Sequence, residues 1–269
     1  MRPIATQQTN PSTRHSLIDF NAFIGPYPYR HVPHPEPAIL DRVIEREQLD
    51  GAWVGHLPSA FHRDPSEGNS ELFAACKPFP RLKPVPTVRP DWPSWKLHLA
   101  RARDAKAPAI RAYPQHWGMG PDDRSMWELA NAAGEQGQAI VLTVRFEDLR
   151  QRHPLDVTSD LQAAAIRSLA RAGNRVRLVV TAAGRDMIEE VHWGLTPDEQ
   201  KRVFWDISWI WGPPEDHLAK LFRTIGSNRF VYGTHWPLRL TQNGRANLDL
   251  LPEDLGGVRL AGEADIFGA

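Results

Sequence analysis

The chain has 269 residues, of which 41% are hydrophobic and 24% are charged, as in ordinary globular proteins. Thirty-two basic residues balance thirty-two acidic ones, so there is no net charge to recruit nucleic acid or an anionic membrane, and we expect neither as a partner. The single cysteine, Cys76, excludes an intrachain disulfide and lies in a segment that predicts an inert, buried thiol.

The beginning of the chain differs from the rest. Residues 1–16 are polar and lack the apolar stretch of about 7–15 residues that marks a signal peptide. No later run approaches the ~18 apolar residues of a membrane span. We therefore expect a cytoplasmic protein with a flexible leader over residues 1–16 and a single domain over residues 17–269.

Short apolar or β-branched runs recur at regular spacing and predict eight strands. In chain order they are Leu17–Ile24, Gly51–Gly55, Leu82–Val88, Ala109–Tyr113, Ala139–Val144, Val176–Val180, Val203–Ile207 and Arg229–Tyr232. Between them, apolar residues at i, i+3, i+4 spacing predict helices within residues 39–44, 72–76, 95–102, 127–133, 161–169 and 218–225. A doubly wound open sheet usually has fewer strands, so the pattern favours a (β/α)8 TIM-type barrel, an α/β fold in one domain.

Three segments at strand ends carry a family resemblance. Residues 17–25 (LIDFNAFIG), residues 181–184 (TAAG) and residues 231–237 (VYGTHWP) resemble the D-x-H-x-H-x-G, D-H-x-G and G-S/T-D-x-P turns of the amidohydrolase superfamily, in its amidohydrolase-related (amidohydrolase 2) branch. The resemblance extends over nearly the whole chain from residue 17 and implies a (β/α)8 barrel. That branch includes metal-dependent decarboxylases of aromatic acids and metal-free lactonases.

The metal-binding positions of that branch are altered in this chain. Asn21 and Phe23 stand where two histidines are expected, Ala182 stands at another histidine position, and His235 replaces an aspartate. Zinc and related metals need three or four N, O or S ligands, and Phe or Ala supplies none. The resemblance therefore implies a degenerate metal site, and we predict no metal and no other cofactor. The alternative is a relocated site made from the loop histidines His56, His62, His116 and His235.

Two arginines end apolar strands at the expected level of the barrel mouth. The planar guanidinium of Arg111 or Arg145 suits two-point binding of a carboxylate or phosphate, so both are predicted to bind an anionic substrate. The alternative is a structural ion pair of Arg111 with Asp206, or of Arg145 with Asp148 or Glu147.

Four further residues at strand ends complete the predicted site. His235 is the candidate general acid or base because imidazole titrates near neutral pH, although it could instead be a histidine that caps its loop. Asp206 could orient that imidazole or activate water if it faces the barrel interior and not the outer face. Asn21 and His56 are predicted to contact the substrate, and structural hydrogen bonding is the alternative for Asn21.

These residues predict a metal-independent hydrolase that acts on a small carboxylated lactone, ester or related carbonyl compound. Its partner would be a small anionic molecule, and the sequence leaves association into a homo-oligomer open. One alternative is a catalytically inactive, anion-binding relative of the amidohydrolases, and another is a decarboxylase with a relocated metal site. An open mouth with His235 and Asp206 within hydrogen-bonding reach favours catalysis, whereas a mouth filled by tryptophans favours a structural or scaffolding role.

Overall fold

The computed structural model describes residues 17–268, so the predicted leader at residues 1–16 lies outside the described residues. The eight described strands are parallel to their neighbours: β1 (Ile18–Ile24), β2 (Gly51–His56), β3 (Leu82–Pro84), β4 (Ala109–Ala112), β5 (Ala139–Thr143), β6 (Leu178–Thr181), β7 (Val203–Asp206) and β8 (Phe230–Val231). They form two sheets, β1-β2-β3 and β4-β5-β6-β7-β8. Single bridges, Thr87 to Arg111 and Ala22 to Trp236, join these sheets into a closed ring.

The third strand is shorter than predicted. The sequence pattern favoured Leu82–Val88, but the regular strand ends at Pro84. Proline has no backbone N–H, and Pro84 and Pro86 therefore interrupt the hydrogen-bond ladder. Only isolated bonds continue beyond this point, including Arg111 N–H to Pro86 O at 2.8 Å and Val88 N–H to Arg111 O at 3.0 Å.

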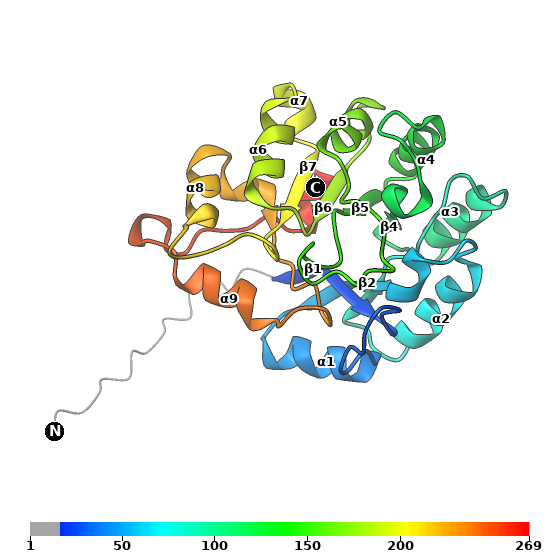
Figure 1. Cartoon of the computed structure of the whole chain (residues 1–269), viewed down its shortest axis with the longest axis horizontal. Helices are drawn as coiled ribbons and strands as arrows, with labels where there is room; N and C mark the ends of the chain where they lie inside the picture. Colours follow the sequence, from blue (N-terminus) through cyan, green and yellow to red (C-terminus); the bar gives the residue numbers. More distant parts are fainter. Residues whose placement is uncertain (1–16, 269) are drawn as a thin grey trace.

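Helices surround the strands in a ring, as seen along the barrel in Figure 1. They are α1 (Pro37–Arg46), α2 (Ser66–Cys76), α3 (Trp95–Asp104), α4 (Arg124–Glu135), α5 (Ala163–Arg171), α6 (Arg185–Trp193), α7 (Pro197–Gln200), α8 (His217–Thr224), α9 (Gln242–Asp249) and α10 (Glu263–Phe267). The six predicted helical segments correspond to α1 to α5 and α8. None of the helices described between residues 17 and 268 has the length and apolar character that a membrane span requires.

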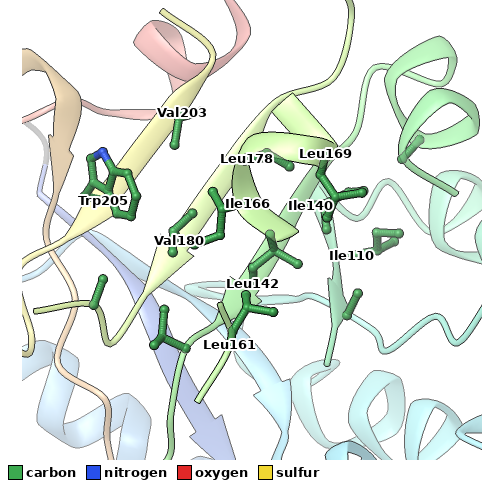
Figure 2. Close-up of a cluster of buried hydrophobic side chains, with 14 of the residues drawn as sticks. Ile110, Ile140, Leu142, Leu161, Ile166, Leu169, Leu178, Val180, Val203 and Trp205 are labelled. Carbon is green, nitrogen blue, oxygen red and sulfur yellow. The ribbon is translucent and has the colours of Figure 1, made fainter. Parts of the chain in front are cut away.

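Alternation along each strand separates the outer core from the barrel interior. In β5, Ile140 and Leu142 pack outward against the helices, while Ala139 and Val141 point inward. Figure 2 shows the outer core, with Leu161, Ile166 and Leu169 lying over strand residues such as Leu142 and Val180. Full burial of a side chain of this size contributes about 1.5–3 kcal/mol, so this layer holds the helices on the barrel.

The C-terminal helix closes the amino-terminal end of the barrel. Ile266 and Phe267 of α10 pack with the inward-facing cluster that includes Phe20, Trp53 and Phe204. Glu263 fixes the helix there, because its carboxylate accepts a hydrogen bond from Trp53 Nε1 at 2.7 Å and pairs with Lys83 Nζ at 2.6 Å. This end of the barrel is therefore a packed floor, and the opposite end receives the loops that follow each strand.

Candidate functional site

A layer of polar side chains lies directly above the apolar interior. Arg111, Thr143, Thr181 and Asp206 each follow an inward-facing apolar residue of the same strand by two positions, so strand alternation turns them inward as well. Asn21 of β1 joins them through its hydrogen bond to Asp206. All five side chains are fully buried. We call these five residues the polar layer.

Asp206 faces the barrel interior, which is one of the two orientations that the sequence allowed. Its carboxylate accepts hydrogen bonds from Asn21 Nδ2 and Ser208 Oγ at 2.7 Å each, and from the backbone N–H of Ala182 at 2.8 Å. Ala182 adopts a φ of 58°, in the left-handed region. Burial raises the pKa of Asp206 to about 6, although these three donors favour the charged form.

His235 is held from both sides of its ring. Nδ1 lies 2.9 Å from Asn21 Nδ2, which can only donate, so Nδ1 accepts and the ring proton is on Nε2. Nε2 then donates to the backbone carbonyl of Phe146 at 3.0 Å. Burial lowers the pKa of His235 to about 3, so the imidazole is neutral near pH 7. Asn21 thus connects His235 to Asp206, and the two titratable groups share no direct hydrogen bond.

A second buried carboxylate ties β1 to the loop after β8. Asp19 accepts hydrogen bonds from Thr234 Oγ1 at 2.6 Å, Thr234 N at 3.0 Å and Asn21 N at 2.9 Å. The pairing of β1 with β2 shifts register between Asp19 and Ala22, so simple alternation does not extend through this segment. These bonds set the position of the loop that carries His235.

Arg111 is fully buried and has no ion-pair partner among residues 17–268. Its guanidinium carbon lies 4.2 Å from the centre of the Phe23 ring. Its two hydrogen bonds are long, at 3.5 Å to Thr143 Oγ1 and 3.4 Å to the carbonyl of Ala22, and Nε has no partner. A Cβ atom at Gly55 would lie 2.6 Å from Nε, so the glycine makes room for this side chain. The alternative pairing of Arg111 with Asp206 is therefore not formed.

Aromatic rings cover the polar layer on the side of the mouth. Phe146 lies at their centre, with ring centroids 5.7 Å from Phe23, 5.6 Å from Tyr113, 5.4 Å from Phe61 and 6.2 Å from Tyr27. These five rings, here called the aromatic layer, form one apolar cluster. Among the described residues, the space above the polar layer is thus filled mainly by Phe and Tyr, and His235 and Asp206 beneath it are fully buried.

Arg145 does not share the environment of Arg111. Its guanidinium pairs with Asp160 at 2.9 Å, not with Asp148 or Glu147 as the sequence suggested, and lies 5.5 Å from the ring of Trp209. Asp160 follows Arg145 by a long loop, so spacing along the chain gave no signal for this pair. The structure places Arg145 at the rim and Arg111 beneath Phe23, and does not bring them into one pocket.

His56 also lies apart from the polar layer. Its Nδ1 is 2.8 Å from Ser59 Oγ, and its Nε2 is 3.2 Å from Glu71 on α2. Gly55, the preceding residue, faces Arg111, so alternation turns His56 outward toward α2. These two contacts connect the end of β2 to the loop that follows it and to α2.

Several hollows are lined by loops at the mouth, and two of them include Arg30 in their lining. The larger, about 780 Å³, is lined only by residues 26–36 and contains none of the predicted site residues. The smaller, about 200 Å³, is called the mouth hollow here and is formed by loops after β1, β5, β7 and β8: Arg30, Phe146, Glu147, Asp148, Arg150, Gln151, Trp209, Trp211, Leu238 and Arg239. Sequence reasoning overlooked Arg239, although its place just after Trp236-Pro237 in the loop following β8 could have identified it.

The donor atoms at the family's metal positions do not fit a metal ion. Phe23 and Ala182 offer no ligand atom, and both nitrogens of His235 are engaged. Asn21 Oδ1 has no hydrogen-bond partner, but one oxygen is fewer than the three or four ligands that such a metal needs. Across residues 17–268, no three His, Cys, Asp or Glu side chains converge so as to hold an ion. His116, another histidine of the predicted relocated site, packs on Phe61 with ring centroids 5.0 Å apart.

Comparisons with known proteins show which solved structures share this fold. No family model matches the sequence, and a search of curated proteins found no match. A crystal structure of a probable 2-pyrone-4,6-dicarboxylic acid hydrolase from Acinetobacter baumannii, with citric acid bound, has a TM-score of 0.60 at 10% identity and covers 94% of this chain and 100% of the other. 5-Carboxyvanillate decarboxylase from Sphingomonas paucimobilis has a TM-score of 0.66 at 14% identity, covering 94% and 99%.

A third structure, 2,6-dihydroxybenzoate decarboxylase from Rhizobium, has a TM-score of 0.63 at 11% identity, covering 93% of this chain and 95% of the other. The resemblance and the barrel predicted from sequence are confirmed at the level of fold. The protein is therefore an α/β barrel with the fold of the amidohydrolase-related (amidohydrolase 2) proteins, a fold that hydrolases and decarboxylases share.

Proposed function

We propose that the protein binds a small carboxylate at the mouth of its barrel and does not hydrolyse it. One observation carries this proposal: the groups predicted to do the chemistry, His235 and Asp206, are fully buried together with Arg111 beneath the aromatic layer. This is the inactive, anion-binding alternative that the sequence left open.

The hydrogen bonds of the buried groups argue against turnover at this position. A general acid or base must come within about 2.6–3.2 Å of the proton that it transfers, directly or through one water. Both nitrogens of His235 already have partners, and the Asp206 carboxylate accepts three hydrogen bonds. Displacing even one ring of the aromatic layer would expose apolar area that contributes about 1.5–3 kcal/mol when buried. Access to these groups is therefore energetically opposed.

The rim is better suited to bind an anion. The guanidinium of Arg239 lies 4.5 Å from the Trp209 ring, which restricts it without neutralising its charge, whereas Arg145 on the same ring is already paired with Asp160. Guanidinium groups match carboxylates in two-point geometry. The hydrolase-like neighbour from Acinetobacter was crystallised with citric acid, itself a carboxylate. These features support carboxylate binding as the function.

A second candidate is the metal-independent hydrolase of a carboxylated lactone or ester. It is favoured by the chain of hydrogen bonds from Asp206 through Asn21 to His235, at 2.7 Å and 2.9 Å, which places two titratable groups around one amide. In this hypothesis His235 would serve as the acid or base, Asp206 would support it, and Arg111 would hold the acid group. It requires the aromatic layer to open for the substrate.

The two candidates separate in one set of assays. Citrate and benzoate are titrated into the protein by calorimetry, and 2-pyrone-4,6-dicarboxylate and simple carboxylated esters are followed by NMR for product. We expect saturable binding and no hydrolysis above the buffer rate. Turnover that His235→Asn lowers by roughly 10²–10⁴-fold, with the fold retained, would overturn the binding proposal in favour of the hydrolase.

A further inference from the structure

The charges around the mouth hollow do not cancel. Arg30 pairs with Glu147, and Arg150 pairs with Asp148 through two contacts, Nε to Oδ1 at 2.9 Å and Nη2 to Oδ2 at 3.2 Å. Arg239 is the third cation of the lining, and its side chain forms no hydrogen bond or ion pair with any described residue. Two ion pairs therefore leave one positive charge facing the hollow.

Arg239 is also held in place. Its guanidinium lies 4.5 Å from the centre of the Trp209 ring, and its backbone N–H donates to the carbonyl of His235 at 3.2 Å. The side chain is partly buried, and burial lowers its pKa from the usual arginine range. A guanidinium fixed through its flat face keeps its N–H groups available at the edge, which is the geometry that binds both oxygens of a carboxylate.

The remaining lining limits the size and charge of the ligand. The hollow, about 200 Å³, is smaller than the roughly 300–1,000 Å³ of pockets for drug-sized molecules. Phe146, Leu238 and Trp211 contribute apolar surface, and Trp211 is 55% exposed, so its indole can cover a flat ligand. Because Glu147 and Asp148 are paired with Arg30 and Arg150, Arg239 is the one cation of the lining left to balance a charge on the ligand, which matches a single carboxylate.

We propose that the mouth hollow is a binding site for a monocarboxylate with a small apolar body. Arg239 holds the carboxylate, and Trp211 covers the body. The assignment rests on the carboxylate-binding function proposed above and places the ligand at the rim, outside the polar layer that contains Arg111.

The test compares benzoate with citrate on the full chain by calorimetry and by NMR of the indole N–H signals. Arg239→Gln removes the charge but keeps a polar side chain, and Arg239→Lys keeps the charge but loses the planar fork. Arg223→Gln is the control, because Arg223 lies on α8 and pairs with Asp254 at 2.9 Å on the surface. Trp211→Leu provides a second, independent variant of the hollow.

We expect benzoate to bind more tightly than citrate, and Arg239→Gln to weaken benzoate binding by roughly 10–100-fold. Arg239→Lys should give an intermediate loss, Trp211→Leu a smaller one, and Arg223→Gln none. Benzoate binding that is equal in the wild type and in both Arg239→Gln and Trp211→Leu would overturn this site while the carboxylate-binding function stands. If neither acid binds to the folded wild-type protein, both proposals are wrong.

Discussion

Substitution of His235 by Asn tests whether the imidazole is buried in its neutral form. His235 has a φ of 61°, and Asn is among the few residues that tolerate this left-handed conformation. Asn Oδ1 can replace Nδ1 as the acceptor from Asn21, but the hydrogen bond to Phe146 O is lost. We expect the variant to fold and to lose about 1–3 kcal/mol of unfolding free energy at pH 7.

The effect of pH on this loss follows from the pKa of His235, which burial lowers from 6.5 to about 3. A lowered histidine pKa contributes stability that is present above 6.5 and lost as the pH falls toward 3. Between pH 7 and 5 the imidazole becomes protonated in the unfolded state but not in the folded state. This protonation stabilises the unfolded wild-type protein by the equivalent of about 1.4 pH units, or about 2 kcal/mol. The difference in unfolding free energy between wild type and His235→Asn should therefore be about 2 kcal/mol smaller at pH 5 than at pH 7.

The pKa shift of Asp206 changes stability with pH in the opposite direction. Its pKa is raised from 3.8 to about 6, so its contribution is present below 3.8 and lost as the pH rises through 6. Because both proteins contain Asp206, its contribution cancels in the difference between them. This is why the comparison of two proteins is more informative than the pH profile of the wild type alone.

The assay is urea denaturation of both proteins at pH 7 and pH 5, with free energies from linear extrapolation. The matched control is His34→Asn, since His34 also has a positive φ, 60°, but is exposed. We expect no narrowing for the control pair. A stability gap for His235→Asn that is the same at both pH values would refute the assignment of a buried, neutral imidazole.

Three further predictions concern the aromatic layer, the thiol of Cys76 and the metal content of the protein. Phe146→Ala should lower the free energy of unfolding by about 3–5 kcal/mol in denaturant titrations, since it removes the central ring of the aromatic layer; a loss below about 1 kcal/mol would contradict that packing. Cys76 should react with a thiol reagent only after unfolding, because it is 4% exposed and burial raises its pKa to about 12; rapid labelling of the native protein would argue otherwise. Addition of a chelator should leave the melting temperature unchanged, and a clear decrease, together with one tightly held ion per chain by elemental analysis, would show a metal site.

The sequence by itself predicted the barrel and much of its layering. Regular spacing of strands and amphipathic helices is a local property, and the two faces of β5 and β7 follow from alternation alone. The same reasoning placed Asp206 on the face of Phe204, and ligand chemistry was sufficient to show that Phe23 and Ala182 cannot hold a metal. Pro84 and Pro86 lie within the predicted strand Leu82–Val88, and that prediction did not account for their ending β3 at Pro84.

Only the tertiary structure decided which polar groups meet and which are accessible. Asn21 contacts Asp206 and His235 across separations of 185 and 214 residues, and these contacts depend on closure of the barrel and on the register shift in β1. The chain likewise gave no signal that Phe23 would cover Arg111, or that Asp160 would pair with Arg145 and leave Arg239 unpaired. Alternation along a strand assigns a side chain to a face, whereas its partner depends on loops that fold back from distant parts of the sequence.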